Sequence, residues 1–211
     1  MASNYDKMLS DGARLFVSKD RSREIRNLGI QCEGDFYTLT FMGEPCRIRR
    51  TDGECEIFSR EDENYKPADF QMTMTLYDII DHASQPFLPS GNDIFFVNLT
   101  KIQNGNAYTG KGIMTEMEEF FDGQTDENIR KAMTAVGGYS WGKGDVSCKI
   151  PVFGNIDVAV SFWHSDEDFP ASLKVYTDDR ILKCMHYETV WYMVAYVLGK
   201  IKEKLVMSTE E

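Results

Sequence analysis

The chain has 211 residues, 42% of them hydrophobic, and its 34 acidic and 23 basic side chains give a formal net charge of −11. This apolar content is enough for a sizeable core and excludes a disordered or fibrous protein. The negative charge repels phosphate backbones and anionic lipids, so we expect neither nucleic acid nor a membrane surface as a partner.

Two helices are expected at the start of the chain. Ser3 and Asp6 have the spacing of a capping box, and apolar residues follow at helical intervals as far as Phe16. A second, short helix is expected over residues 21–28, because Gly29 is typical of a helix end.

A small antiparallel meander is expected between residues 36 and 58, where β-forming residues predominate. The pair Asp52-Gly53 is typical of a tight turn between two strands. A turn of two residues would place Ile48 opposite Ile57, with Cys46 on the same face of the meander.

The rest of the chain mixes helices with strands. Apolar spacing, turn residues and the helix cap at Thr125 predict a helix over 73–83, a strand over 94–99, a turn at 104–106, a helix over 125–136, strands over 156–163 and 173–176, and a helix over 187–205.

These patterns predict an α+β fold. We expect a single domain, 1–211, with antiparallel sheets, helices packed on one side and a long buried C-terminal helix. In this interpretation residues 1–68 form the N-terminal helices and the meander, and residues 69–206 form the core.

The cysteines indicate a reducing compartment. There are five, an odd number, and no two have the CxxC spacing. The first residues lack the pattern of a signal or transit peptide, and the longest apolar run, 190–198, is about half of what a bilayer span requires. We therefore expect a cytoplasmic protein. The cysteine spacings also match no iron–sulfur signature.

A glycine-rich segment, residues 137–144, approaches the phosphate-binding pattern G-x-x-x-x-G-K-[ST]. Its last position is Gly144 where the pattern needs a hydroxyl, and a helix precedes it where the phosphate loop needs a strand. We therefore reject nucleotide binding. A plain connector and a mobile lid over another ligand both remain open.

The most distinctive segment joins the last two predicted strands and contains one imidazole and three carboxylates. His164, Asp166 and Asp168 would offer three metal ligands from one loop, because zinc, iron and manganese accept imidazole with carboxylate. A solvated acidic turn is the alternative interpretation. A further ligand would have to come from elsewhere, and His186 is the residue we select; His82 is assigned a structural role at a helix end. A divalent metal is the only cofactor that this pattern suggests.

Aromatic side chains in or near these loops predict a contact surface. Tyr139 and Trp141 lie in the glycine-rich segment, and Trp163 and Phe169 flank the acidic turn. If they line one exposed patch or cleft, they would bind an unidentified protein or small molecule.

Three stretches of the chain together resemble a known family. They run through Leu76–Ile80, Ile150-Pro151 and, most specifically, Asp166–Ser172. Their order is similar to that in the prokaryotic family called domain of unknown function 3786, over about residues 70–200. The resemblance implies a cytoplasmic prokaryotic domain, encountered largely in anaerobes and sometimes joined to an iron–sulfur segment, which this chain lacks. It implies no established activity and no catalytic residues.

Three hypotheses follow for the function, which the sequence itself leaves unknown. The first is a non-enzymatic binding or accessory domain, because no nucleophile–base arrangement is present. The alternative is a metal-assisted hydrolytic enzyme built on His164, Asp166 and Asp168. The third is a homodimeric structural protein whose final helix packs across a two-fold axis.

Overall fold

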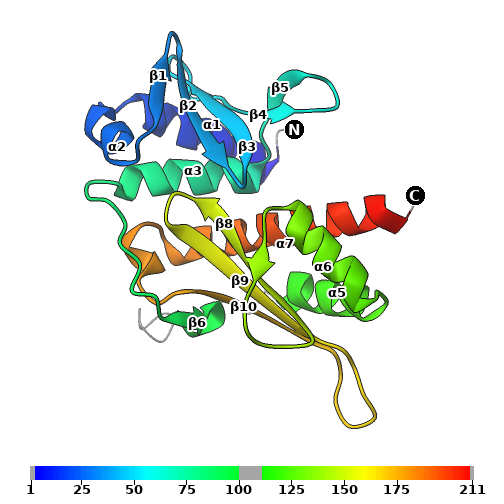
Figure 1. Cartoon of the computed structure of the whole chain (residues 1–211). Helices are drawn as coiled ribbons and strands as arrows, with labels where there is room; N and C mark the ends of the chain where they lie inside the picture. Colours follow the sequence, from blue (N-terminus) through cyan, green and yellow to red (C-terminus); the bar gives the residue numbers. More distant parts are fainter. Residues whose placement is uncertain (1–2, 100–110, 210–211) are drawn as a thin grey trace. The chain divides into compact units, whose positions relative to one another are not determined.

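A computed structural model describes residues 3–99 and 111–209 (Figure 1). The chain divides into two compact units, one made of Met1–Leu88 with Leu182–Met193, the other of Pro89–Ile181 with Val194–Glu211. Each unit combines helices with one antiparallel sheet, so the predicted α+β class is confirmed. The single domain stays a prediction.

The first unit contains the predicted helices and meander. Its described elements are α1 (Asn4–Val17), α2 (Ser22–Asn27), β1 (Gln31–Glu33), β2 (Phe36–Phe41), β3 (Glu44–Arg49), β4 (Cys55–Ser59), β5 (Asn64–Pro67), α3 (Phe70–His82) and the 3-10 turn η2 (Ile181–Lys183), most of which belongs here. The strands pair in chain order, as expected of a meander. The strand β5 was not predicted, because its polar sequence resembles a loop.

Local sequence explains where the first helices begin. The predicted capping box is present: the Ser3 hydroxyl accepts from the Asp6 amide, and the Asp6 carboxylate accepts from the Ser3 amide. Asp69 caps α3 by accepting from the Met72 amide, and this helix buries apolar side chains such as Leu76.

The predicted hairpin register between β3 and β4 was wrong. Ile48 lies opposite Cys55, and Cys46 lies opposite Ile57. The amide of Arg49 donates to the Glu54 carbonyl, so four residues form the turn and the register shifts by two. A shift of two keeps the same side chains on the same face, and the core therefore contains the expected residues.

The second unit contains a five-stranded sheet. Its described elements are β6 (Asp93–Phe95), the 3-10 turn η1 (Phe96–Asn98), α5 (Lys111–Asp122), α6 (Asp126–Ala135), β7 (Tyr139–Ser140), β8 (Val146–Phe153), β9 (Ile156–Trp163), β10 (Ser172–Asp178) and the second part of α7 (Tyr187–Thr209). The strand order is β6-β10-β9-β8-β7. The predicted strand over 94–99 is shorter than expected, α5 was not predicted, and the turn at 104–106 lies outside the described residues.

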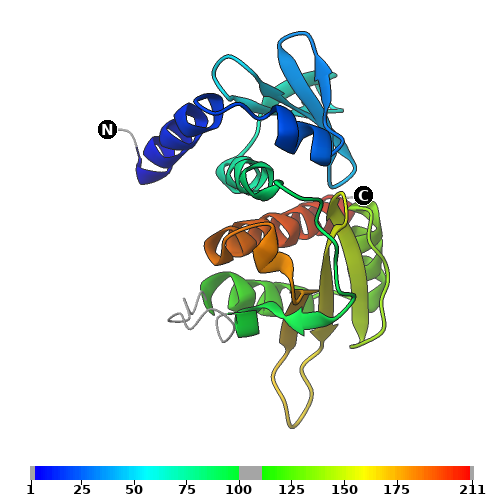
Figure 2. The same cartoon turned by 90° about the vertical axis from the view of Figure 1, so that its left-hand side faces the viewer.

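The two faces of this sheet differ. Alternate residues of β9, including Val158, Val160 and Phe162, are fully buried on the face where α5 and α6 pack against β8, β9 and β10. The second part of α7 lies behind the same face in Figure 1 and beside it in Figure 2, and it buries Ile201 and Leu205. The expectation of helices on one side and a buried final helix is confirmed. Among the described helices, none is long and apolar enough to cross a membrane.

Candidate functional site

The face of the second sheet opposite the helices carries most of the predicted aromatic side chains. Residues directly opposite each other on paired strands project to the same face. Tyr139 pairs with Lys149, Lys149 with Ala159, and Ala159 with Tyr176, so this row crosses from β7 to β10. Trp163 belongs to the same face, because it lies four residues from Ala159 on β9.

The rings on this face are partly exposed. Tyr139 is 51% exposed, and the Trp141 ring lies 5.1 Å from that of Tyr176. The Trp163 ring has the Lys174 ammonium 5.2 Å from its centroid, within the range of a cation–π contact. We call Tyr139, Trp141, Trp163 and Tyr176 the aromatic face. It contains three of the four residues predicted to bind a ligand.

Phe169, the fourth predicted aromatic residue, lies on the loop between β9 and β10. This loop extends beyond the end of the sheet (Figure 1), and the ring is 70% exposed. None of the four is buried in a separate part of the core, although their role in binding stays a prediction.

Polar groups lie among the rings. Lys149 and Asp93 form an ion pair of 2.5 Å, with both side chains more than four-fifths buried. Burial raises the pKa of Asp157, and the nearby positive charge of Lys149 opposes that shift. Ser161 is fully buried, and within residues 3–99 and 111–209 its hydroxyl has no hydrogen-bond partner.

His164 contacts two carboxylates that the sequence did not associate with it. Its Nε2 lies 2.9 Å from Asp126 and its Nδ1 lies 3.3 Å from Asp122, at the facing ends of α6 and α5. Ser165 donates to Asp122 through both its amide and its hydroxyl, and these bonds lower the pKa of that carboxyl. The imidazole therefore connects the β9–β10 loop to two helices, and these contacts indicate a structural role for His164.

The other members of the predicted metal set lie elsewhere. The Asp166 carboxylate accepts from the amides of Asp168 and Phe169 and closes a turn of its own loop. In the part of the chain that the structure describes, His164, Asp166 and Asp168 do not form a group of neighbouring ligand atoms. Metal binding at this loop stays a prediction that the geometry does not favour.

His186, which the sequence analysis selected as a distant ligand, belongs to the first unit and lies beside Asp78 and His82. The sequence predicts only a helix-end role for His82, and Asp78 was not predicted as a ligand. Their separation by four residues on one helix was the signal that could have identified the pair, because such residues share a face.

The glycine-rich segment is attached to the sheet at both ends. Tyr139 and Ser140 form β7, and the amide of Asp145 donates to the Phe162 carbonyl. Gly144, at φ +98°, lies so close to Phe162 that an added Cβ would be 2.7 Å from its carbonyl oxygen. These contacts favour the connector interpretation, while a lid role for the residues between them stays a prediction.

Comparison with known proteins gives one match. No curated protein and no solved structure matches the chain. The model of the family described as Domain of unknown function (DUF3786) matches residues 21–200, so the likeness begins well before the residue at which the resemblance was expected to start. The chain belongs to this family of unknown function.

Proposed function

We propose that this chain is a non-enzymatic binding domain and that its aromatic face binds a protein partner. The family resemblance implies that this happens in the cytoplasm of a prokaryote, and of an anaerobe in particular. The observation that carries the proposal is the convergence of Tyr139, Trp141 and Trp163 on the sheet face opposite the helices. Their side chains come from two separate segments, residues 137–144 and β9, and a purely structural role would not require them to be partly exposed.

A protein partner suits this surface better than a small molecule. The rings lie on the face of a β-sheet, which is a broad surface, and Trp and Tyr are the residues that most often dominate protein interfaces. Phe169, on the β9–β10 loop, adds a further exposed aromatic side chain. Lys174 and the Lys149–Asp93 pair supply polar contacts that would fix the orientation of the partner.

The cytoplasmic location is supported by the thiols. All five cysteines are free, and four of them are buried. Burial raises the pKa of Cys46, Cys55 and Cys148 to about 12, so these thiols remain protonated and unreactive. A fold that keeps five unpaired cysteines suits a reducing compartment.

The experiment compares proteins captured from the native host by the parent chain and by variants. Trp163→Ala and Tyr139→Ala remove partly exposed rings, and Leu88→Ala, 69% exposed in the first unit, is the matched control. Loss of a central aromatic contact costs about 2 kcal/mol, or roughly thirtyfold in Kd. We expect one protein to be captured by the parent and by Leu88→Ala and to be lost with both aromatic variants. Equal capture by all four chains, or no specific capture by the parent, would contradict the proposal.

A further inference from the structure

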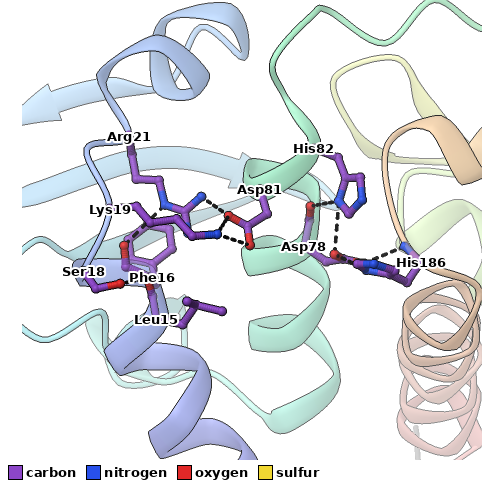
Figure 3. A network of polar contacts seen from close by, with 9 residues as sticks. All are labelled: Leu15, Phe16, Ser18, Lys19, Arg21, Asp78, Asp81, His82 and His186. Carbon is purple, nitrogen blue, oxygen red and sulfur yellow. Dashed lines mark hydrogen bonds and ion pairs between the residues drawn. The ribbon is translucent and has the colours of Figure 1, made fainter.

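Three potential metal ligands converge in the first unit, whereas the aromatic face belongs to the second. Asp78 and His82 lie one turn apart near the end of α3, and His186 immediately precedes α7 (Figure 3). Each offers one ligand atom, and these atoms all lie within 4.8 Å of one another. Among the described residues, no other group of three histidine, cysteine or carboxylate side chains brings its ligand atoms this close together.

The distances suit a shared ion. Asp78 Oδ1 lies 2.8 Å from His186 Nδ1 and 3.2 Å from His82 Nδ1. Ligands bound at about 2.1 Å in a tetrahedral site lie about 3.4 Å apart, so small movements of the side chains would admit a zinc-sized ion. Because metal ligands must be deprotonated, the ion would displace any proton on the coordinating nitrogen and oxygen atoms.

The three side chains are held in place without an ion. The second oxygen of Asp78 accepts from the His186 amide at 2.7 Å, which fixes the segment before α7 against α3. The His82 ring nitrogen also lies 2.9 Å from the Asp78 carbonyl oxygen, and the two imidazole rings meet edge to face at 4.6 Å. These contacts limit the movement of the two rings.

We propose that Asp78, His82 and His186 bind one divalent transition-metal ion. Two imidazoles with one carboxylate favour zinc, iron, cobalt or nickel over magnesium and calcium, which prefer sites made of oxygen ligands. The Asp78 side chain is 12% exposed, whereas that of His186 is 71% exposed, so the site is anchored on its inner side and open on its outer side. The remaining coordination positions are accessible to water or to a ligand.

The chain supplies a matched control for this proposal. It has three histidines, and the third, His164, also contacts two carboxylates but lies in the second unit. Cys32 is the exposed thiol and could bind zinc on its own, so Cys32→Ser is used as the common background.

The test titrates the chelator-treated full chain with Co²⁺ and with Zn²⁺. Visible absorption reports the coordination of cobalt, and calorimetry gives the zinc stoichiometry and affinity. We expect one ion per chain, at least tenfold weaker binding for His186→Ala and for His82→Ala, and unchanged binding for His164→Ala. Because His186 is largely exposed, its variant should keep the parental circular dichroism spectrum.

Three outcomes would overturn the proposal: no ion bound by the parent, parental affinity in folded His186→Ala, or equal weakening in His164→Ala. The proposal is independent of the aromatic face. His186→Ala should therefore capture the same partner as the parent chain, and failure of either test leaves the other interpretable.

Discussion

The buried guanidinium of Arg21 makes a strong stability prediction for the first unit. Its side chain is 5% exposed and forms an ion pair with Asp81 on α3 (Figure 3). It also donates to the Phe16 carbonyl and lies 5.1 Å from the centre of that ring. Asp81→Asn removes the opposing charge and leaves the guanidinium buried with only neutral partners.

The expected loss follows from the exposure of the two partners. Removing one member of a fully buried ion pair costs about 3–5 kcal/mol. The Asp81 side chain is 27% exposed, and Lys19, also bound to it at 3.2 Å, is 47% exposed, so solvent screens part of the interaction. We therefore expect Asp81→Asn to lower the free energy of unfolding by about 2–3 kcal/mol at pH 7. Glu127→Gln breaks a pair whose members are 64% and 76% exposed, and it should cost less than about 0.5 kcal/mol.

Urea unfolding measures this loss. Trp191 belongs to the first unit and the other two tryptophans to the second, so a background with Trp141→Phe and Trp163→Phe makes fluorescence report the unit that contains Asp81. In that background, circular dichroism provides the readout for the control in the second unit. If Asp81→Asn unfolds within 0.5 kcal/mol of its parent, the argument from the buried guanidinium is refuted.

The same ion pair predicts how stability depends on pH. Burial alone would raise the pKa of Asp81, but hydrogen bonds and the charges of Arg21 and Lys19 outweigh it and lower that pKa. A carboxyl whose pKa is lowered in the folded state stabilises the protein above its unfolded pKa, about 3.9 for Asp, and loses that contribution as pH falls through the folded value. The difference between the parent and Asp81→Asn should therefore be full at pH 7 and shrink below about pH 4. A difference that grows on acidification would contradict this sign.

Two further predictions concern the glycine-rich segment and the thiols. Gly144→Ala should destabilise the second unit by about 1–2 kcal/mol in urea unfolding, because a Cβ at φ +98° would meet the Phe162 carbonyl. Gly142→Ala is the control and should change the stability little, since nothing lies within 4 Å of the added Cβ. Equal effects of the two substitutions would contradict the close approach at Gly144. In the native protein one thiol, that of Cys32, should react rapidly with a disulfide reagent, and the other four, which are buried, should react only after unfolding in urea. Rapid reaction of two or more thiols in the native protein would contradict the burial.

Much of the fold could be predicted because local signals agreed with the final packing. The capping box at Ser3, the cap at Thr125 and the alternation along β9 all act within a few residues. The register between β3 and β4 could not be predicted, because Asp52-Gly53 is compatible with more than one turn length. The helix α5 was missed although its sequence contains a signal: Met114, Met117 and Phe121 recur at helical spacing and would have predicted it.

The candidate sites depended more on tertiary structure. Strand register explains why Tyr139 and Trp163 share a face, and Trp141 lies against Tyr176 of the same face. The partners of His164 and His186 could not be read from nearby residues. Asp122 and Asp126 approach His164 only because α5 and α6 meet at the β9–β10 loop, and Asp78 is more than 100 residues from His186.

The most direct test of the proposed function is site-specific photo-crosslinking in the native host. A photoreactive phenylalanine replaces Tyr139, at 51% exposure on the aromatic face, and in a second chain it replaces Leu88, at 69% exposure in the first unit. If the aromatic face binds a protein, position 139 should give one discrete crosslinked species that disappears when Trp163→Ala is added, and position 88 should give none. No adduct at position 139, or the same adducts from both positions, would contradict the assignment of this face as the binding surface.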